Sequence, residues 1–348
     1  MRSEVAALGE SADLQNLVLE VTPRCNNACL HCYNYWSHDR DVQGRVNPLS
    51  RGEIFSLFSD PCVQGHGAQV ALSGGEPLLR RDLTEITCDL FGLGLRPVVI
   101  TNASLLNARI LRALPRGTIF EVTLFSADRD LHDRIAGRRC FDRVVGNLLL
   151  VERFRHRFVL ACVLTRLNAP DIKRTIKLGL ALGAEAVLLN RVNLTRRTLP
   201  LADTLVPPAP VLRDSLAEVN DLAAALDISI AVSVPVPPCV ADAREYGQLH
   251  FGWCPRGGQG AYYTIGWDGR VRPCNHSSIV LGDIRRTPLL DAVDEAKARP
   301  LWARMPKECE ACSHPLRDLC RGGCPAAAYE CYGTSARIDP FVDLANRV

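Results

Sequence analysis

Between Leu17 and Val234 the chain alternates short runs rich in β-branched residues with longer amphipathic segments. Six runs have the length and composition of strands, at 17–21, 69–73, 97–101, 119–125, 157–164 and 185–189. Apolar residues recur at helical spacing over 50–60, 81–92, 104–114, 141–154, 170–183 and 210–227. This alternation predicts an α/β fold of parallel βαβ units with right-handed crossovers. An open doubly wound sheet and a curved partial barrel both fit the pattern.

The alternation stops at the proline-rich segment "AVSVPVPPCV" (231–240), whose prolines suit a linker better than a central strand. The chain beyond it is rich in loops and cysteine. Its clearest hairpin is "AYYTIGWDGRVRP" (261–273), where Asp268-Gly269 predicts a two-residue turn. A region with so few apolar runs needs metal to supply folding free energy. We therefore expect two domains, 1–234 and 235–348.

Cysteine is the compositional outlier, with 15 residues in a chain of 348. The N-terminal segment lacks the apolar stretch of a signal peptide, and no run approaches the roughly 18 apolar residues of a membrane span. We therefore expect a cytoplasmic protein whose thiols are reduced and whose clustered cysteines bind metal or take part in catalysis. The net charge of +3 gives little reason to expect a nucleic-acid or membrane partner.

Three cysteines follow the first predicted strand in "RCNNACLHCYNYW" (24–36), with the spacing Cys25-x3-Cys29-x2-Cys32. The carboxyl ends of parallel strands are where α/β folds place their sites. Three thiolates on one loop can hold three irons of a cubane cluster and leave the fourth iron open. Structural zinc sites are normally closed by four ligands, which disfavours zinc here.

A glycine pair follows the second predicted strand in "LSGGEPLL" (72–79). Gly74 and Gly75 permit a backbone approach that is too close for any Cβ atom. Glu76 then presents a carboxylate beside the cysteine loop. The alternative is a simple strand-to-helix turn with a capping acid.

The cysteine spacing and the Gly-Gly-Glu segment together resemble the radical S-adenosylmethionine (SAM) superfamily. The resemblance implies a partial (β/α)6 barrel and a [4Fe–4S] cluster whose open iron binds SAM, which is then cleaved to a 5′-deoxyadenosyl radical. It also implies that His31 packs near the adenine and that Glu76 receives the SAM ammonium. The other SAM contacts that it implies are Gly74, Gly75, Asn102, Thr123 or Ser126, and Asn168, although polar residues at strand ends are also common in turns.

The C-terminal cysteines resemble the seven-cysteine SPASM extension of radical SAM enzymes, which holds two auxiliary [4Fe–4S] clusters. Carried over by order, one cluster takes Cys254, Cys274 and Cys324, with Cys239 as a candidate fourth ligand. The other takes Cys309, Cys312, Cys320 and Cys331. Seven residues separate Cys312 from Cys320 where five are usual, and the last gap is short, so the exact ligand assignment departs from the usual pattern. A zinc ribbon over 309–331 is an alternative. We assign no metal or catalytic role to Cys62, Cys88, Cys140 and Cys162, and we expect Cys88 and Cys162 to be small, buried apolar residues.

The resemblance implies an enzyme that abstracts hydrogen from a substrate carbon, most often in a ribosomally made peptide, to give a crosslink, a thioether or an oxidised residue. A flavodoxin or ferredoxin would supply the electron. Only 24 residues precede Cys25, fewer than the leader-recognition domain of some peptide maturases needs. Asn275 follows Cys274 where sulfatase maturases have Asp, which disfavours that group. The alternatives are a dehydrogenase or tailoring enzyme acting on a small molecule, such as a carbohydrate or tetrapyrrole, and a non-enzymatic iron–sulfur or zinc protein.

Overall fold

The computed structural model describes residues 16–36, 47–64, 69–256, 262–298 and 304–347. Their strands form one sheet in the order β11-β10-β9-β1-β2-β3-β4-β5-β6-β7-β8. The strands are β1 (Asn16–Thr22), β2 (Gln69–Gly74), β3 (Arg96–Thr101), β4 (Ile119–Thr123), β5 (Arg157–Leu164), β6 (Ala186–Arg191), β7 (Ile230–Val232), β8 (Leu249–Phe251), β9 (Tyr263–Ile265), β10 (Arg270–Arg272) and β11 (Gly282–Asp283).

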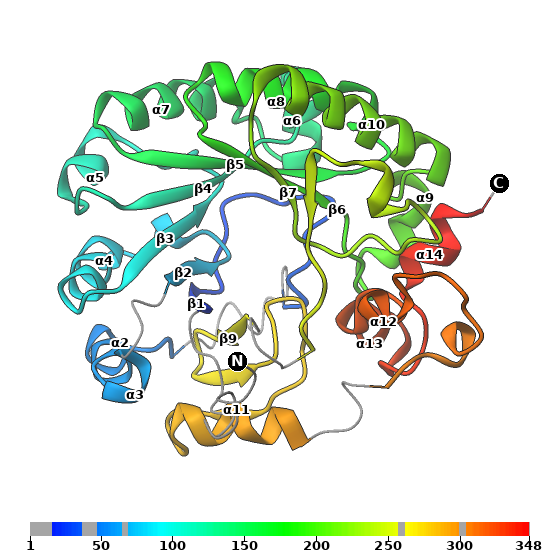
Figure 1. Ribbon diagram of the computed structural model, residues 1–348. Helices are drawn as coiled ribbons and strands as arrows, with labels where there is room; N and C mark the ends of the chain where they lie inside the picture. The colour runs from blue at the N-terminus through cyan, green and yellow to red at the C-terminus, as the bar shows by residue number, and fades with distance from the viewer. Residues whose placement is uncertain (1–15, 37–46, 65–68, 257–261, 299–303, 348) are drawn as a thin grey trace, which may run out of the picture.

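Strands β1 to β8 are parallel, and all six strands predicted from sequence are present. The sheet curves, and helices cover its outer side (Figure 1). The predicted α/β fold with a parallel sheet is therefore confirmed. The additional strands β7 and β8 have three residues each, which is too short for a periodic sequence pattern to predict them.

The outer helices are α2 (Arg51–Phe58), α3 (Pro61–Gln64), α4 (Leu83–Gly92), α5 (Ala108–Ala113), α6 (Arg129–Ala136), α7 (Phe141–Arg153), α8 (Ile172–Ala181), α9 (Ala202–Leu205) and α10 (Ala209–Leu226). The C-terminal region adds α11 (Leu289–Ala298), α12 (Arg317–Cys320), α13 (Pro325–Tyr332) and α14 (Pro340–Ala345). Helix α11 packs on β10 and β11, whereas α12, α13 and α14 lie toward the open side of the curved sheet (Figure 1). Within the described residues, no helix has the length and apolarity to cross a bilayer.

Burial alternates along the strands. In β4, Phe120 and Val122 are fully buried in the apolar core under the helices, whereas Ile119, Glu121 and Thr123 are half-buried on the other face. Strand β6 repeats this alternation. Burying each large apolar side chain contributes about 1.5–3 kcal/mol, so the outer layer holds the fold together. The inner face is only partly covered and keeps polar side chains accessible.

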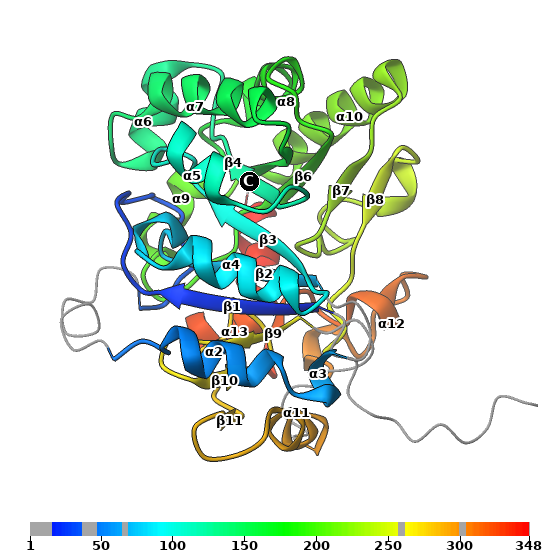
Figure 2. The ribbon, with the colours of Figure 1, turned by 90° about the vertical axis from the view of Figure 1, so that its left-hand side faces the viewer.

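The C-terminal region continues the same sheet. Strand β9 pairs in parallel with β1, on the side opposite β2, and β10 and β11 extend that edge (Figure 2). Strand β8 extends the other edge. The domain boundary near residue 235 remains a prediction, but hydrogen bonding of the sheet runs across it.

The turn between β9 and β10 differs from the prediction. The Gly269 amide donates to the Gly266 carbonyl (2.9 Å), so Trp267 and Asp268 occupy the central turn positions. The Gly266 amide donates to Arg270 (2.8 Å), and Gly269 has a φ of 88°, which is the left-handed glycine of a G1 bulge. The predicted two-residue turn at Asp268-Gly269 is therefore wrong.

Two buried ion pairs tie the C-terminal region to the sheet. Arg272 of β10 pairs with Glu20 of β1, and both side chains are almost fully buried. Arg191 at the end of β6 pairs with Asp339, which also accepts the Cys324 amide (2.8 Å). A buried charge is costly without its partner, so each pair fixes how its two elements meet.

The cysteines outside the predicted clusters are not all buried. Cys162 is buried as predicted, and Cys140 is also buried. Cys88 is exposed on α4, because the helix turns it away from the sheet, so that prediction is wrong. The side chain of Cys62 lies outside the described residues.

We expect Glu20→Gln to lower the free energy of unfolding by about 3–5 kcal/mol, because it leaves the buried Arg272 guanidinium without a countercharge. Urea titration measures the change. The control is Glu185→Gln, which breaks the exposed Arg157–Glu185 pair (2.6 Å) and should cost less than about 1 kcal/mol. Equal losses in the two variants would contradict a special role for the buried pair.

Candidate functional site

The three clustered cysteines lie on the loop that leaves β1 at its carboxyl end. Cys25 is exposed, and Cys29 and Cys32 are half-buried. No three described cysteines have their sulfur atoms within 4.8 Å of one another. Four thiolates at 2.3 Å from a tetrahedral zinc would be about 3.8 Å apart. The described thiols are therefore not arranged as a ready-made zinc site, which disfavours the zinc alternative.

The C-terminus of α6 holds this loop in place. The backbone amides of Ala28 and Leu30 donate to the carbonyls of Ala136 and Ile135, both at 3.0 Å. These carbonyls would otherwise be left unpaired at the helix end. Gly137 caps the helix with a φ of 66°, and a Cβ atom there would lie 2.5 Å from the Ala28 carbonyl oxygen. The cysteine loop and α6 can meet only because this residue is glycine.

The glycine pair after β2 docks onto the start of the same loop. The Gly75 amide donates to Thr22 (2.8 Å), and the Glu76 amide donates to Arg24 (2.7 Å). A Cβ atom on Gly74 would lie 2.3 Å from the Thr22 carbonyl oxygen, and one on Gly75 would lie 2.1 Å from that of Arg24. Both glycines are therefore required by close backbone contact, as the sequence predicted.

Glu76 is 1% exposed, and its carboxylate accepts three hydrogen bonds. The donors are the Thr101 hydroxyl (2.6 Å), the Asn102 amide (2.9 Å) and the Leu78 amide (3.2 Å). No described cationic side chain pairs with it. Burial raises the pKa of this carboxyl to about 7, although the three donors oppose the rise. Glu76 is thus a buried acid that a cation would stabilise in its ionised form.

A polar network joins the cysteine loop to the end of β3. The Asn102 side-chain amide donates to Asn26 (2.9 Å), and the Asn26 amide donates to Ser104 (2.8 Å). The Ser104 hydroxyl closes the triangle on Asn102 (2.6 Å). Asn102 therefore lies beside the loop and Glu76, as predicted, while Asn26 and Ser104 are members that the sequence analysis missed.

Two of the residues predicted to contact SAM use their side chains for hydrogen bonds within the protein instead. Ser126 is fully buried, and its hydroxyl donates to Asp171 (2.7 Å) while accepting from Asp128 (2.9 Å). Asn168 is fully buried, and its side-chain amide donates to the carbonyls of Phe125 and Val163 (2.8 and 2.9 Å). Thr123, by contrast, is half-buried on the inner face. The geometry favours Thr123 over Ser126 as a SAM contact. Asn168 stabilises the fold through its two hydrogen bonds.

His31 is 7% exposed and packs edge-on against Phe125, with ring centroids 5.0 Å apart. Its Nδ1 atom is buried and has no partner among the described residues. Burial, with a contribution from Arg197, lowers the pKa of His31 to about 4, so the ring is neutral. An unpaired buried nitrogen beside the cysteines is a polar position open to a ligand.

Desolvation of two sulfur atoms on the loop favours their protonated form. It raises the pKa of Cys25 to about 11, and it raises that of Cys29 further. Such thiols ionise when a metal takes up their negative charge. Arg197 also donates to the Cys29 and Cys32 carbonyls (3.4 and 3.5 Å), which adds positive charge to the loop.

The C-terminal thiols can be compared by which other thiols lie near enough to affect their pKa. Burial raises the pKa of Cys239 to about 11, and the neighbouring thiols Cys320, Cys309 and Cys312 raise it further. The packing also places the segment around Cys239 beside the segment that carries Cys320. A Cβ atom on Gly322 would lie 3.5 Å from the Cys309 sulfur, and one on Gly323 would lie 3.1 Å from Pro237. Cys239 thus lies with the set that sequence order assigned to the second cluster.

A second set of thiols lies around Cys324. The thiols of Cys324 and Cys254 both raise the pKa of Cys274 beyond the effect of burial. Burial is the main cause that raises the pKa of Cys331 on α13 to about 12, and Asp339, Glu330 and Cys324 add to it. Cys324 is the N-cap of that helix, so Cys331 lies two turns further along it, about 10 Å away. The cluster to which Cys331 belongs stays a prediction.

His132, Asp133 and Cys140 form the group of described ligand atoms that lie within 4.8 Å of one another. Their hydrogen bonds explain this without a metal. The His132 Nδ1 accepts the Phe125 amide (3.3 Å), and its Nε2 contacts the Cys140 sulfur (3.6 Å). Asp133 accepts the Cys140 and Phe141 amides at the start of α7 (2.8 and 2.9 Å). The group therefore holds α6 to α7.

Other polar residues face the inner side of the sheet near the cysteines. The Tyr33 hydroxyl accepts the Asn275 side-chain amide (3.0 Å), and its ring packs edge-on against His276 with centroids 4.4 Å apart. Glu121 has no hydrogen bond or ion pair with a described residue, and burial raises the pKa of its carboxyl to about 7. The position of Tyr33 and His276 next to predicted cysteine ligands was the signal that could have identified them.

The comparisons with known proteins agree with this geometry. The model of the radical SAM superfamily matches residues 19–179, and that of the SPASM iron–sulfur cluster-binding domain matches residues 254–324. This chain belongs to the radical SAM superfamily. It carries a C-terminal SPASM domain, and both memberships imply bound iron–sulfur clusters, the first with SAM.

Solved structures of radical SAM enzymes share the fold. Streptococcus suis SuiB bound to precursor peptide SuiA has a TM-score of 0.75 at 15% identity, with 95% of this chain and 76% of SuiB covered. Native anSMEcpe with bound AdoMet has a TM-score of 0.73 at 16% identity, with 95% of this chain and 94% of that chain covered. At such low identity, these similarities establish the fold alone.

We expect Gly75→Ala to displace the cysteine loop, because the new methyl group would overlap the Arg24 carbonyl. The variant should retain less iron after anaerobic reconstitution and bind SAM at least tenfold more weakly. Iron analysis and equilibrium dialysis measure the two effects. Gly92→Ala is the matched control, since a Cβ atom there meets nothing within 4 Å. Normal iron content and SAM affinity in Gly75→Ala would refute the close-contact argument.

Proposed function

We propose that this radical SAM enzyme abstracts hydrogen from a carbon of a peptide substrate and so modifies the peptide after translation. The observation that carries the proposal is the backbone docking of the Gly74–Gly75 pair onto the start of the cysteine loop. This contact brings three thiols, a buried acid and a histidine to one edge of the sheet. A protein that only carried electrons would have no need for the buried acid beside the cluster loop.

The residues fit a bound cluster and SAM in three respects. Three thiols lie on one loop without a fourth cysteine, and the buried His31 Nδ1 lacks a described partner. The paired glycines also hold Glu76 against the start of the cysteine loop. Cys25, Cys29 and Cys32 would hold the cluster. His31, Gly74, Gly75, Glu76, Asn102 and Thr123 would bind SAM. Together the cluster and SAM would supply the 5′-deoxyadenosyl radical.

Glu76 would bind the SAM ammonium. A carboxylate offers about four lone-pair positions, and three are taken by Thr101, Asn102 and Leu78. One position remains for an incoming N–H donor. The three existing bonds hold the carboxylate in a fixed orientation, so little freedom is lost when SAM binds.

Peptide is the substrate class that we propose. SuiB has been solved with precursor peptide SuiA and anSMEcpe with Cp18Cys peptide, and both share this fold over 95% of the present chain. The half-exposed inner face, with Glu121 and Thr123, offers accessible polar groups beside the cysteine loop. A crosslink, a thioether and an oxidised residue all remain products that this arrangement could form. A small-molecule substrate is the alternative.

The SPASM domain would hold two auxiliary [4Fe–4S] clusters. From the grouping of the thiols we propose Cys239, Cys309, Cys312 and Cys320 for one cluster. We propose Cys254, Cys274, Cys324 and Cys331 for the other. These clusters would relay electrons or brace the fold, and an external flavodoxin or ferredoxin would supply the electron for SAM cleavage.

The proposed activity is tested with Cys25, Cys29 and Cys32 all changed to Ala. The variant should lose about four irons, the content of one cubane. It should also form no 5′-deoxyadenosine from SAM and dithionite, because no iron remains to bind SAM. Iron analysis and chromatography measure both results against the reconstituted wild type. Deoxyadenosine formation at the wild-type rate would overturn the assignment.

The role of Glu76 predicts a pH dependence. The carboxyl, with a pKa of about 7, is protonated below that pH and ionised above it, so SAM affinity should increase as the pH rises through 7. Glu76→Gln should remove this dependence and weaken binding by about 1.5–3 kcal/mol. Calorimetry over that pH range measures both effects.

Glu121→Gln is the matched control, because burial also raises the pKa of that carboxyl to about 7. It should leave SAM affinity and its pH dependence nearly unchanged. Equal effects of the two substitutions, or a wild-type affinity that ignores pH, would contradict the assignment of Glu76.

The grouping of Cys239 predicts which substitutions share an effect. In a variant that lacks Cys309 and Cys312, adding Cys239→Ala should cause no further loss of iron. In a variant that lacks Cys254 and Cys274, adding Cys239→Ala should remove up to about four more irons. Iron analysis with Mössbauer spectroscopy measures this. The exposed Cys88→Ala is the control in each background, and the reverse pattern would assign Cys239 to the other cluster.

A further inference from the structure

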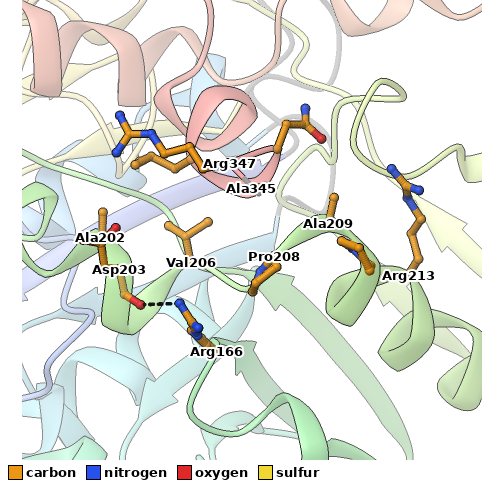
Figure 3. A pocket seen from close by; sticks show the side chains of 12 residues that line it. Arg166, Ala202, Asp203, Val206, Pro208, Ala209, Arg213, Ala345 and Arg347 are labelled. Atoms are coloured by element: carbon orange, nitrogen blue, oxygen red, sulfur yellow. Dashed lines mark hydrogen bonds between the residues drawn. The ribbon is translucent and has the colours of Figure 1, made fainter.

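A cavity of about 650 Å³ lies between α9, the start of α10 and α14 (Figure 3). Its volume is within the range of about 300–1,000 Å³ that is typical of ligand pockets. Three arginines from separate elements line it: Arg166 after β5, Arg213 on α10 and Arg347 after α14. The acidic residue in the lining is Asp203.

None of the three guanidinium groups pairs with a described carboxylate. Arg166 donates to the backbone carbonyl of Asp203 (3.1 Å; Figure 3), and Arg213 donates to that of Val240 (2.7 Å). Arg347 has no side-chain hydrogen bond with a described residue. The backbone bonds orient two of the arginines without neutralising them, so the pocket keeps a net positive charge.

A second cavity of nearly equal size, about 640 Å³, shows what a neutralised pocket looks like in this protein. It also has three arginines in its lining: Arg129, Arg139 and Arg143. Three aspartates accompany them, Asp130, Asp133 and Asp142, and Asp142 pairs with Arg129 at 2.8 Å. The arginines of the pocket at α14 are exposed and lack this compensation, so their charges are available to an anionic ligand.

The chemistry of the walls favours a peptide over a small inorganic anion. Val206, Pro208, Ala209 and Ala345 supply apolar surface between the arginines (Figure 3). Three separated guanidinium groups can each bind a carboxylate. A peptide with acidic residues interspersed among apolar ones could pair with the guanidinium groups and pack against the apolar side chains.

The position of the pocket connects it to the proposed active site. Arg166 follows the carboxyl end of β5, and α9 belongs to the connection that follows β6. That same connection carries Arg197, which contacts the carbonyls of Cys29 and Cys32. Five residues lead from Arg197 to Ala202 at the pocket, a path of at most about 18 Å. An extended peptide of six to eight residues would span such a distance.

We propose that this pocket binds an acidic segment of the substrate peptide and presents a residue several positions away to the cysteine loop. The inference rests on the proposed peptide substrate. It makes the pocket an anchoring site, separate from the residues that hold the cluster and SAM.

The test is fluorescence anisotropy of the reconstituted full chain with a fluorescein-labelled peptide, Gly-Glu-Leu-Glu-Glu-Leu-Glu-Gly. The same peptide with every Glu replaced by Gln should bind at least tenfold more weakly. The variant Arg166→Gln/Arg213→Gln/Arg347→Gln should also lose at least tenfold in affinity. The matched control is Arg129→Gln/Arg139→Gln/Arg143→Gln, which removes the same charge from the neutralised pocket and should change affinity less than twofold.

Asp203→Asn is a second test variant. Its expected effect is stronger binding, which misfolding of the pocket could not produce. It removes the lining carboxylate and should strengthen binding of the Glu peptide twofold to fivefold. Equal weakening by the two triple variants would show a general charge effect and overturn the proposal, as would wild-type affinity in the pocket variant. Binding of inorganic tripolyphosphate with no binding of the Glu peptide would also overturn it and identify a phosphate site.

The measurement uses neither SAM nor a reductant, so its outcome is independent of the proposed reaction. Peptide binding without deoxyadenosine formation would support the anchoring site and count against the proposed activity. Deoxyadenosine formation without peptide binding would retain the activity and reject the anchoring site.

Discussion

The contact on which the rest of the site depends is the docking of Gly74 and Gly75 against the backbone of residues 22–24. Two amides donate across this contact, and neither glycine has room for a single methyl group. The contact fixes the cysteine loop relative to β2, and therefore relative to Glu76. Glu76 in turn is held by β3, whose end is tied back to the loop through Asn102 and Asn26. Three consecutive strand ends are thus joined in one closed set of hydrogen bonds.

Helix α6 completes the support from the other side. Its last carbonyls accept amides of the cysteine loop, and Gly137 allows that approach. Backbone atoms therefore hold the loop at its start and at residues 28–30, and the Asn26 side chain adds bonds to the end of β3. This leaves the cysteine sulfurs free for ligation. It also explains how a loop with so many polar residues keeps one conformation next to a partly open inner face.

Much of the fold could be predicted from sequence because the signals were local. Strand and helix periodicity identified β1 to β6, and the glycine pair identified the close contact at Glu76. What could not be predicted depended on long-range pairing. Strands β7 and β8 are too short to show a period, and β9 pairs with β1 although the two strands lie far apart in the sequence. The buried ion pair between Glu20 of β1 and Arg272 of β10 likewise joins distant segments.

The site residues divide in the same way. The cysteine spacing was sufficient to identify Cys25, Cys29 and Cys32, since their proximity is fixed by the chain. Ser126 and Asn168 share the sequence context of ligand-binding strand ends, yet each is buried and hydrogen-bonded to its own scaffold. A polar residue at a strand end can bind a ligand or hydrogen-bond to the protein itself. Only its partners in the folded structure show which of the two applies.

The charged side chains discussed above differ in whether they have a partner of opposite charge within the protein. Arg191 and Arg272 are buried, and each is neutralised by one carboxylate, because an unpaired buried cation would destabilise the fold. Glu76 is also buried and Glu121 is half-buried, but neither has a described cationic partner, and desolvation raises the pKa of both. The arginines around the pocket at α14 are likewise uncompensated. Among the described residues, the two buried arginines that join the C-terminal region to the sheet are thus paired within the chain. Glu76 at the cysteine loop, Glu121 on the inner face and the arginines of the pocket at α14 have no described partner of opposite charge, and a ligand could supply one.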